Sequence, residues 1–196
     1  MSASSTSERS LRVPLFRHRT LPTVLTVFLQ VFLLSTLAVS PARAQSEDQV
    51  KAAFLFNFAR YVEWPASAFG ADGAPIRICM IGSGGFSSVV SKAVTGKSVG
   101  DRAVEVDTPA DLGSTSGCHI LYVGDGADSA PSAVAAQVDG ASVFTVADRE
   151  GFAEGGGIAN FIRADNKIRF EINPGAAKKA GLKVSSRLLR LAKVVD

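Results

Sequence analysis

The chain has 196 residues, with 21 basic and 18 acidic side chains and a formal net charge of +3. Five of the basic residues and one acidic residue lie in residues 1–44, so residues 45–196 carry 16 basic and 17 acidic side chains, a net charge of −1. The basic balance of the whole chain therefore comes from its N-terminal segment, and it gives no argument for a nucleic acid partner.

The N-terminal segment has the three parts of a secretory signal peptide. Arginines precede an apolar stretch over residues 21–39, and Ala42-Arg43-Ala44 follows as a small-x-small cleavage site. We predict that residues 1–44 are removed and that Gln45 becomes the N-terminus. An uncleaved anchor helix is the alternative, because about 20 apolar residues can span a bilayer. The interruptions of the stretch, which favour cleavage, are Pro22, Gln30 and Ser35.

Residues 45–196 are long enough for one domain with a core of its own. They contain no second apolar run of membrane length, so we expect no stable membrane insertion after cleavage. We therefore predict a single exported domain over residues 45–196.

The first expected element of this domain is a helix from residue 47 to about Val62. Ser46 and Gln49 have the spacing of a capping box at its start. Trp64-Pro65 ends the helix, because the residue before a proline avoids the helical region. A buried strand over 76–81, a helix over 84–94 and a strand over 102–107 are expected next.

The second half begins with a continuous apolar strand over 118–123, followed by a short helix over 132–138 and a strand over 142–146. Strands over 158–162 and 168–172 are expected to form a hairpin, because turn residues separate them. Asn173-Pro174 starts a helix that Gly181 ends. A last helix over 187–194 is expected to turn three leucines to the core, Leu188, Leu189 and Leu191.

Helices alternate with strands in this pattern, and several strands are apolar throughout. The combination predicts an α/β fold with a mostly parallel central sheet covered by helices on both faces. The C-terminal hairpin would add antiparallel edge strands.

Two cysteines, Cys79 and Cys118, lie in the exported part. An oxidising compartment favours a disulfide between them, and two buried free thiols are the alternative. The first and third strands of a doubly wound sheet are commonly neighbours, which would bring the pair together. However, Gly82 and Gly124 end those strands three and six residues after the respective cysteines. The resulting offset of about 10 Å would need a stagger or a bulge to close it.

Motifs for catalysis and cofactor binding are weak. Residues 45–196 contain one histidine, His119, and adjacent strand residues point to opposite faces, which argues against a dyad with Cys118. Gly82-Ser83-Gly84-Gly85 follows a strand and opens a helix, but Ser87 stands where the dinucleotide fingerprint needs a third glycine. No potential ligands have metal-site spacing. We expect no cofactor, no metal and no enzymatic activity.

Aromatic residues crowd the first helix and its end. Phe54 and Phe58 are one turn apart, whereas Phe56 lies well around the helix. The apolar surface therefore exceeds what one core contact uses, which indicates either an interface or a helix buried between layers.

The segment KAAFLFNFARYVEWP, residues 51–65, closely resembles the opening of the YfiR-like periplasmic proteins. Four pieces of the C-terminal half are similar to the same family in the same order, and the resemblance covers nearly all of residues 50–195. These pieces are Gly156-Gly157-Ile158 with Phe161, Ile168 to Asn173, Ala180-Gly181-Leu182, and Ser185 to Ala192. The family-motif residues, with structural or partner-binding roles, are Asn57, Glu63, Trp64, Pro65, Arg169, Glu171, Asn173, Arg187, Leu188 and Leu189.

The resemblance implies a regulator rather than an enzyme. The best-known member restrains an inner-membrane diguanylate cyclase by binding its periplasmic sensing domain, which lowers cyclic di-GMP and biofilm formation. By this resemblance we expect a periplasmic domain whose partner is a membrane sensor protein and which can form a homodimer. Some members carry a second cysteine pair where this chain has Ala153 and Asn160, so switching through that pair is not implied. An exported small-molecule-binding module that uses the Gly82–Gly85 turn is the alternative.

Overall fold

Helix α2 (Glu47–Tyr61) opens the part of the chain that the structure, a computed structural model, describes: residues 46–196. Ser46 Oγ accepts a hydrogen bond from the backbone N–H of Gln49 at 3.2 Å, and the Gln49 side chain accepts one from the Ser46 N–H at 2.9 Å. The predicted capping box is therefore formed. The predicted signal peptide and its cleavage site lie outside the described residues.

Eight strands form the central sheet in the order β10-β8-β7-β6-β5-β2-β4-β3. The pairs joining β4, β2, β5, β6 and β7 are all parallel, whereas β7–β8 and β3–β4 are antiparallel. Their bounds are β2 (Ile76–Ile81), β3 (Ser98–Val99), β4 (Arg102–Asp107), β5 (Ile120–Val123), β6 (Phe144–Ala147), β7 (Ala159–Ala164), β8 (Lys167–Ile172) and β10 (Lys193–Val194). A separate pair joins β1 (Val62–Glu63) to β9 (Lys183–Val184).

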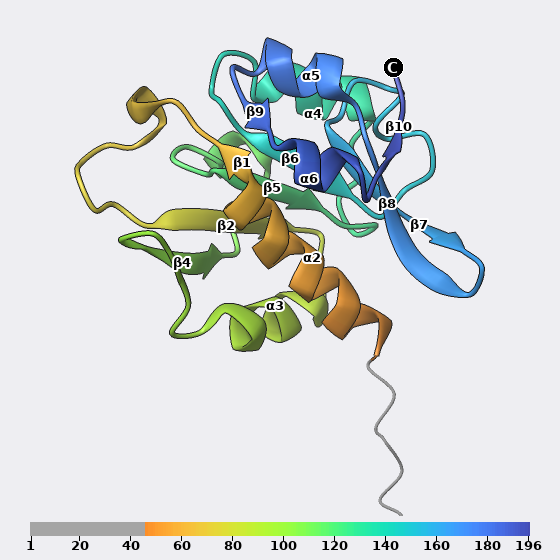
Figure 1. Cartoon of the computed structure of the whole chain (residues 1–196), viewed down its shortest axis with the longest axis horizontal. Helices are drawn as coiled ribbons and strands as arrows, with labels where there is room; N and C mark the ends of the chain where they lie inside the picture. The colour runs from red at the N-terminus through yellow and green to blue at the C-terminus, as the bar shows by residue number, and fades with distance from the viewer. Residues whose placement is uncertain (1–45) are drawn as a thin grey trace, which may run out of the picture. The chain divides into compact units, whose positions relative to one another are not determined.

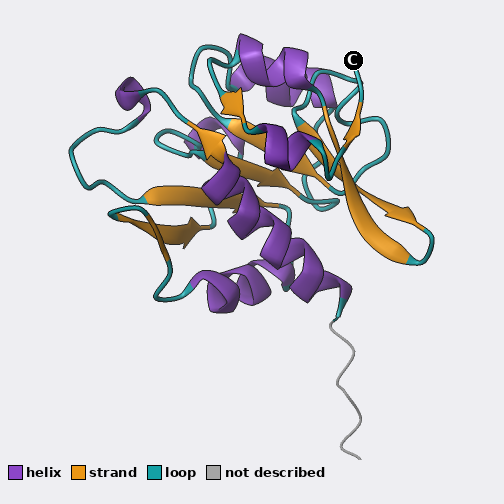
Figure 2. Cartoon of the chain, viewed as in Figure 1, coloured by secondary structure: helices purple, strands orange, loops and turns teal. Residues whose placement is uncertain are grey.

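Helices cover both faces of this sheet (Figures 1 and 2), as the sequence predicts. They are α2, α3 (Phe86–Val94), α4 (Pro131–Gln137), α5 (Pro174–Lys179) and α6 (Ser186–Leu189), with short 3-10 turns η2 (Ala66–Ala68) and η3 (Leu112–Ser114). None of the helices between residues 46 and 196 is long and apolar enough to cross a membrane.

Two groups of buried side chains lie on opposite faces of the sheet. Along β2, Ile78 and Met80 belong to the larger group with α2 and α3, whereas Cys79 and Ile81 belong to the smaller group with α4. This alternation follows from the two-residue period of a strand. The mostly parallel α/β fold is confirmed, because each strand of the centre supplies apolar side chains to both layers.

The β7–β8 hairpin forms where the sequence predicts it. Asp165 and Asn166 adopt positive φ angles of 51° and 56°, the conformation of a tight two-residue hairpin turn that these residue types tolerate. The expectation that the hairpin would form the sheet edge is wrong, because β10 pairs in parallel with the outer side of β8.

The prediction of a last helix over 187–194 is also wrong. Helix α6 ends at Leu189, and Lys193 and Val194 form β10 against Glu171 and Ile172 of β8. Leu188 is buried, but Leu191 is 60% exposed and does not face the core. A helical spacing of leucines could not reveal that pairing with a distant strand would extend the chain here.

Candidate functional site

Cys79 and Cys118 form a disulfide with their Cα atoms 5.8 Å apart. Cys79 lies on β2, and β5 is a parallel neighbour of β2. The sequence predicts that these two strands are neighbours. The register does carry the three-residue offset, since Cys79 lies opposite Leu121. Both cysteines are buried in the core group beneath α4.

The offset is closed by a turn, because the strand predicted over 118–123 starts only at Ile120. The Cys118 N–H donates to the carbonyl of Thr115 at 3.2 Å, so the chain before β5 is folded back instead of extended. A polar hollow of about 310 Å³ lies beside the disulfide and is lined in part by the Arg77–Asp107 ion pair.

Trp64 anchors the segment after α2 to the start of β5. Its Nε1 donates to the carbonyl oxygen of His119 at 3.2 Å, and its ring meets the imidazole edge-on at 6.1 Å. Phe69 stacks on the same imidazole with ring centroids 4.5 Å apart, and the Arg102 guanidinium lies 3.8 Å from the Phe69 centroid. Pro65 caps η2 within this segment.

His119 lies directly before β5, not within a strand as the sequence pattern suggests. Its Nδ1 accepts a hydrogen bond from the N–H of Arg77 at 3.1 Å. It is 4% exposed, and its Nε2 is a buried atom without a hydrogen-bond partner among residues 46–196. Since Cys118 is oxidised and packs in the other core group, the pair cannot act as a catalytic dyad.

The burial of His119 predicts that the stability of the domain depends on pH. Burial lowers the pKa of His119 from its ordinary value of 6.5; the Ala68 carbonyl opposes this effect, and the charges of Arg102 and Arg77 add to it. The unfolded chain therefore binds more protons than the folded chain once the pH falls below about 6.5. The stability that depends on neutral His119 is fully present above that pH and decreases below it.

We expect the free energy of unfolding to decrease below pH 6.5 by up to about 1.4 kcal/mol per pH unit. The control is His119→Asn, which keeps an acceptor near the Nδ1 position and has no titrating ring. Urea unfolding between pH 5 and 6.5 measures both slopes, in a range that excludes the ordinary carboxylate and α-amino pKa values. Equal slopes for the two proteins would contradict the assignment to His119.

The C-terminal motif residues have mainly structural contacts. Asn173 caps α5, since its Oδ1 accepts from the Ala176 N–H at 2.8 Å, and its Nδ2 donates to the Ala153 carbonyl at 3.2 Å. Glu171 is buried and pairs with Lys193 of β10 at 2.7 Å. Leu188 is buried in the core, Leu189 packs partly against it, and Arg169 is exposed on β8.

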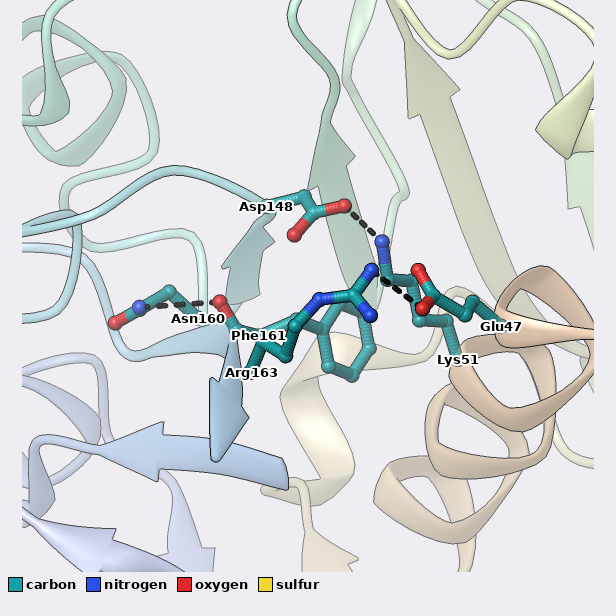
Figure 3. A network of polar contacts seen from close by, with 6 residues as sticks. All are labelled: Glu47, Lys51, Asp148, Asn160, Phe161 and Arg163. Carbon is teal, nitrogen blue, oxygen red and sulfur yellow. Dashed lines mark hydrogen bonds and ion pairs between the residues drawn. The ribbon is translucent and has the colours of Figure 1, made fainter. Parts of the chain in front are cut away.

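Two ion pairs fix the first turns of α2 (Figure 3). Lys51 contacts Asp148, which directly follows β6, and Glu47 contacts Arg163 of β7. The Lys51 side chain is only 12% exposed, so its pair is shielded from solvent more than an ordinary surface pair. The helix that follows the predicted cleavage site is therefore held to the sheet at its start.

The sequence profile of the YfiR/HmsC-like family matches residues 48–193. The chain belongs to this family. YfiR-like proteins are periplasmic, and the disulfide of this chain fits an oxidising compartment. None of the curated proteins compared with the chain matches it.

Two solved structures share the fold at low sequence identity. A conserved domain protein from Vibrio cholerae has a TM-score of 0.53 and 11% identity, over 77% of this chain and 60% of that chain. The ABC domain in complex with L-Trp from Streptococcus pneumoniae has a TM-score of 0.50 and 12% identity, over 76% of this chain and 60% of that chain. The chain thus spans about three fifths of each, and these likenesses show an α/β fold alone.

Ala153 and Asn160, which by the family resemblance lie in the region of a second cysteine pair, are in contact in this chain. The Ala153 N–H donates to Asn160 Oδ1 at 3.3 Å, and both residues are buried. A hydrogen bond therefore links these positions, and it cannot be reduced as a disulfide can.

The Gly82–Gly85 turn serves backbone packing. Gly82 has a φ of +56°, and a Cβ there would lie 2.1 Å from the Ala127 backbone nitrogen. The adjacent hollow of about 350 Å³ has Asp111 and Asp128 in its lining and no basic side chain. The two aspartates would repel a phosphate or carboxylate, so the hollow does not favour an anionic ligand at this turn.

One side of α2 remains open to solvent within the part of the chain that the structure describes. Ala52, Leu55, Phe58 and Ala59 are buried, whereas Phe56, Asn57 and Tyr61 are half-buried and Arg60 is exposed. The pKa of Tyr61 lies below its ordinary value of 10.0, first because Arg187 donates a hydrogen bond to the phenol and second because Arg60 adds positive charge. The open side of α2 thus brings the motif residues Asn57 and Arg187 to one surface with aromatic rings.

Several of these features had no signal in local sequence. Neither His119 nor Phe69 belongs to a recognisable sequence motif, and the stacking of their rings depends on a turn before β5. Glu63, in contrast, lies on β1 as an exposed residue opposite Lys183, where a family-motif residue can be reached by a partner.

Among residues 46–196 no cluster of three or more His, Cys, Asp or Glu side chains could hold a metal ion.

Proposed function

We propose that this chain is a periplasmic regulatory protein that binds and restrains an inner-membrane sensor enzyme, most simply a diguanylate cyclase. Binding would lower cyclic di-GMP and so limit biofilm formation. The observation that carries the proposal is the YfiR/HmsC-like match over residues 48–193. Export through residues 1–44 is part of the proposal, because the sensing domain of such a partner lies outside the cytoplasm.

The described side chains support a binding role. The one histidine of the domain is buried against aromatic rings, and Cys79 and Cys118 are bonded to each other. Neither group is therefore available as a nucleophile or general base. In contrast, α2 presents half-buried aromatic side chains and the exposed Arg60, and aromatic residues and arginine are enriched at protein interfaces.

Crosslinking in intact cells tests this function. The full chain with a C-terminal affinity tag is crosslinked in the cells that encode it and purified from solubilised envelopes, and the partners are identified by mass spectrometry. The matched control lacks residues 1–44 and stays in the cytoplasm. We expect the exported chain, and not the control, to capture an inner-membrane protein with a periplasmic domain.

A second readout makes the capture decisive. Purified residues 45–196 should lower the cyclase activity of the captured protein in reconstituted membranes. Recovery of no membrane protein, together with a tightly bound metabolite on the purified chain, would contradict the proposal.

A further inference from the structure

Basic and aromatic side chains from three separate elements meet on the open side of α2. We name this surface the α2 cationic face; it consists of Phe56, Arg60, Tyr61, Lys97 and Arg187. Three of its members lie on α2, Lys97 lies between α3 and β3, and Arg187 lies on α6. Helix α2 packs against both α3 and α6 and lies between them in Figure 1.

The cations of this face lie near two aromatic rings. The Arg60 guanidinium is 5.4 Å from the centroid of Tyr61 and 6.0 Å from that of Phe56. The Lys97 ammonium is 4.6 Å from the Phe56 centroid, and the Arg187 guanidinium is 5.7 Å from the Tyr61 centroid. These contacts hold three long side chains close to the helix surface and leave their charged ends exposed.

Carboxylates do not neutralise this face within residues 46–196. The ion pairs of that region use Lys51, Arg77, Arg163, Lys179 and Lys193. Arg60, Lys97 and Arg187 take part in none of them, and Glu63, the nearest acid along the chain, forms no ion pair either. The domain has a net charge of −1 over residues 45–196, so this concentration of unpaired positive charge is local.

The residue types favour a protein partner over a lipid surface. Phe56 and Tyr61 pack partly against the core and lie beneath their cations, so they offer little apolar surface for insertion into a bilayer. Two arginines beside one tyrosine can instead bind carboxylates in a bidentate geometry, with the phenol as a further hydrogen-bonding group.

We infer that the α2 cationic face is a docking surface for an acidic, glutamate- or aspartate-rich segment of a protein partner. The inference rests on the proposed function, because it specifies which part of a regulatory partner this chain recognises. Complementary charge would speed association and would make binding weaken as salt rises.

The direct test uses two fluorescein-labelled peptides of about twelve residues, one with six glutamates and one with glutamines at the same positions. Fluorescence anisotropy measures their binding to residues 45–196, to Arg60→Glu/Arg187→Glu and to Lys167→Glu/Lys178→Glu. The last variant is the matched control, because it makes the same charge change at exposed lysines on β8 and α5. Thermal unfolding establishes that both variants fold.

We expect the glutamate peptide to bind the wild-type domain, with a Kd that rises at least about tenfold in the α2 variant and less than about twofold in the control. The glutamine peptide should not bind. An equal loss of affinity for the glutamate peptide in both variants would show that binding depends on net charge alone, and this would overturn the inference. The inference also fails if vesicles of phosphatidylcholine with phosphatidylglycerol sediment the domain through this face while the glutamate peptide does not bind.

Crosslinking separates this inference from the proposed function. If the wild-type chain captures a membrane sensor and Arg60→Glu/Arg187→Glu captures it equally well, the docking surface is wrong and the regulatory function stands. If the wild-type chain captures no sensor, the proposed function fails, and peptide binding would then report on an unrelated acidic partner.

Discussion

Removing the disulfide by Cys79→Ala/Cys118→Ala is expected to lower the free energy of unfolding by about 3–4 kcal/mol. The bond joins residues 39 apart and closes a loop that includes α3, β3 and β4. Without it the unfolded chain gains the conformational freedom of that loop. Alanine is chosen because both sites are buried among apolar side chains, where a serine hydroxyl would lack partners.

Urea unfolding with and without reductant measures this effect. The reductant should move the wild-type midpoint toward that of the double variant and leave the variant itself unchanged. Alkylation of protein taken directly from the cell envelope, followed by mass spectrometry, establishes whether the bond exists there. Two freely alkylated thiols in the unreduced sample would contradict the disulfide.

Trp64→Ala is expected to destabilise the domain by about 3 kcal/mol, the lower part of the range for truncating a packed tryptophan. The lower value applies because Trp64 is half-buried. The change removes packing against the main core group, the edge-on contact with His119 and the hydrogen bond to the His119 carbonyl. The segment around Phe69 and η2 would lose its attachment to the start of β5.

Trp64→Phe is the control, since it keeps an aromatic ring and loses the indole N–H. Its cost should be smaller, about 1–2 kcal/mol, in the same denaturation measurement. Unchanged stability of Trp64→Ala, combined with loss of partner capture, would show that this residue belongs to an interface instead of the structural network.

Elements with a strong local pattern agree with their sequence predictions. The capping box at Ser46, the apolar β2 strand and the Asp165-Asn166 turn each depend on residues that are close in sequence. The shortest strands could not be predicted in this way. β1, β3, β9 and β10 have two residues each, too few to show a period, and they exist because a distant strand pairs with them.

The α2 cationic face could likewise be predicted only in part from local sequence. Aromatic crowding in α2 predicts either an interface or burial, and the structure buries Phe58 on one side of the helix and leaves Phe56 and Tyr61 half-buried. Arg187 and Lys97 could not be connected with α2 from spacing, since α6 and the connection between α3 and β3 reach it only in the folded chain. Similarly, the turn that brings Cys118 to Cys79 is stabilised by Thr115 and Arg77 and has no local sign.

Cyclic di-GMP in living cells tests the central claim most directly. Its level would be measured in cells that lack this chain, and again after they receive either the full chain or a version without residues 1–44. Our account predicts that loss of the chain raises cyclic di-GMP and that only the exported full chain restores the original level. An unchanged level in the deletion, or restoration by the version without residues 1–44, would contradict a regulator that acts from the periplasm on a membrane-bound cyclase.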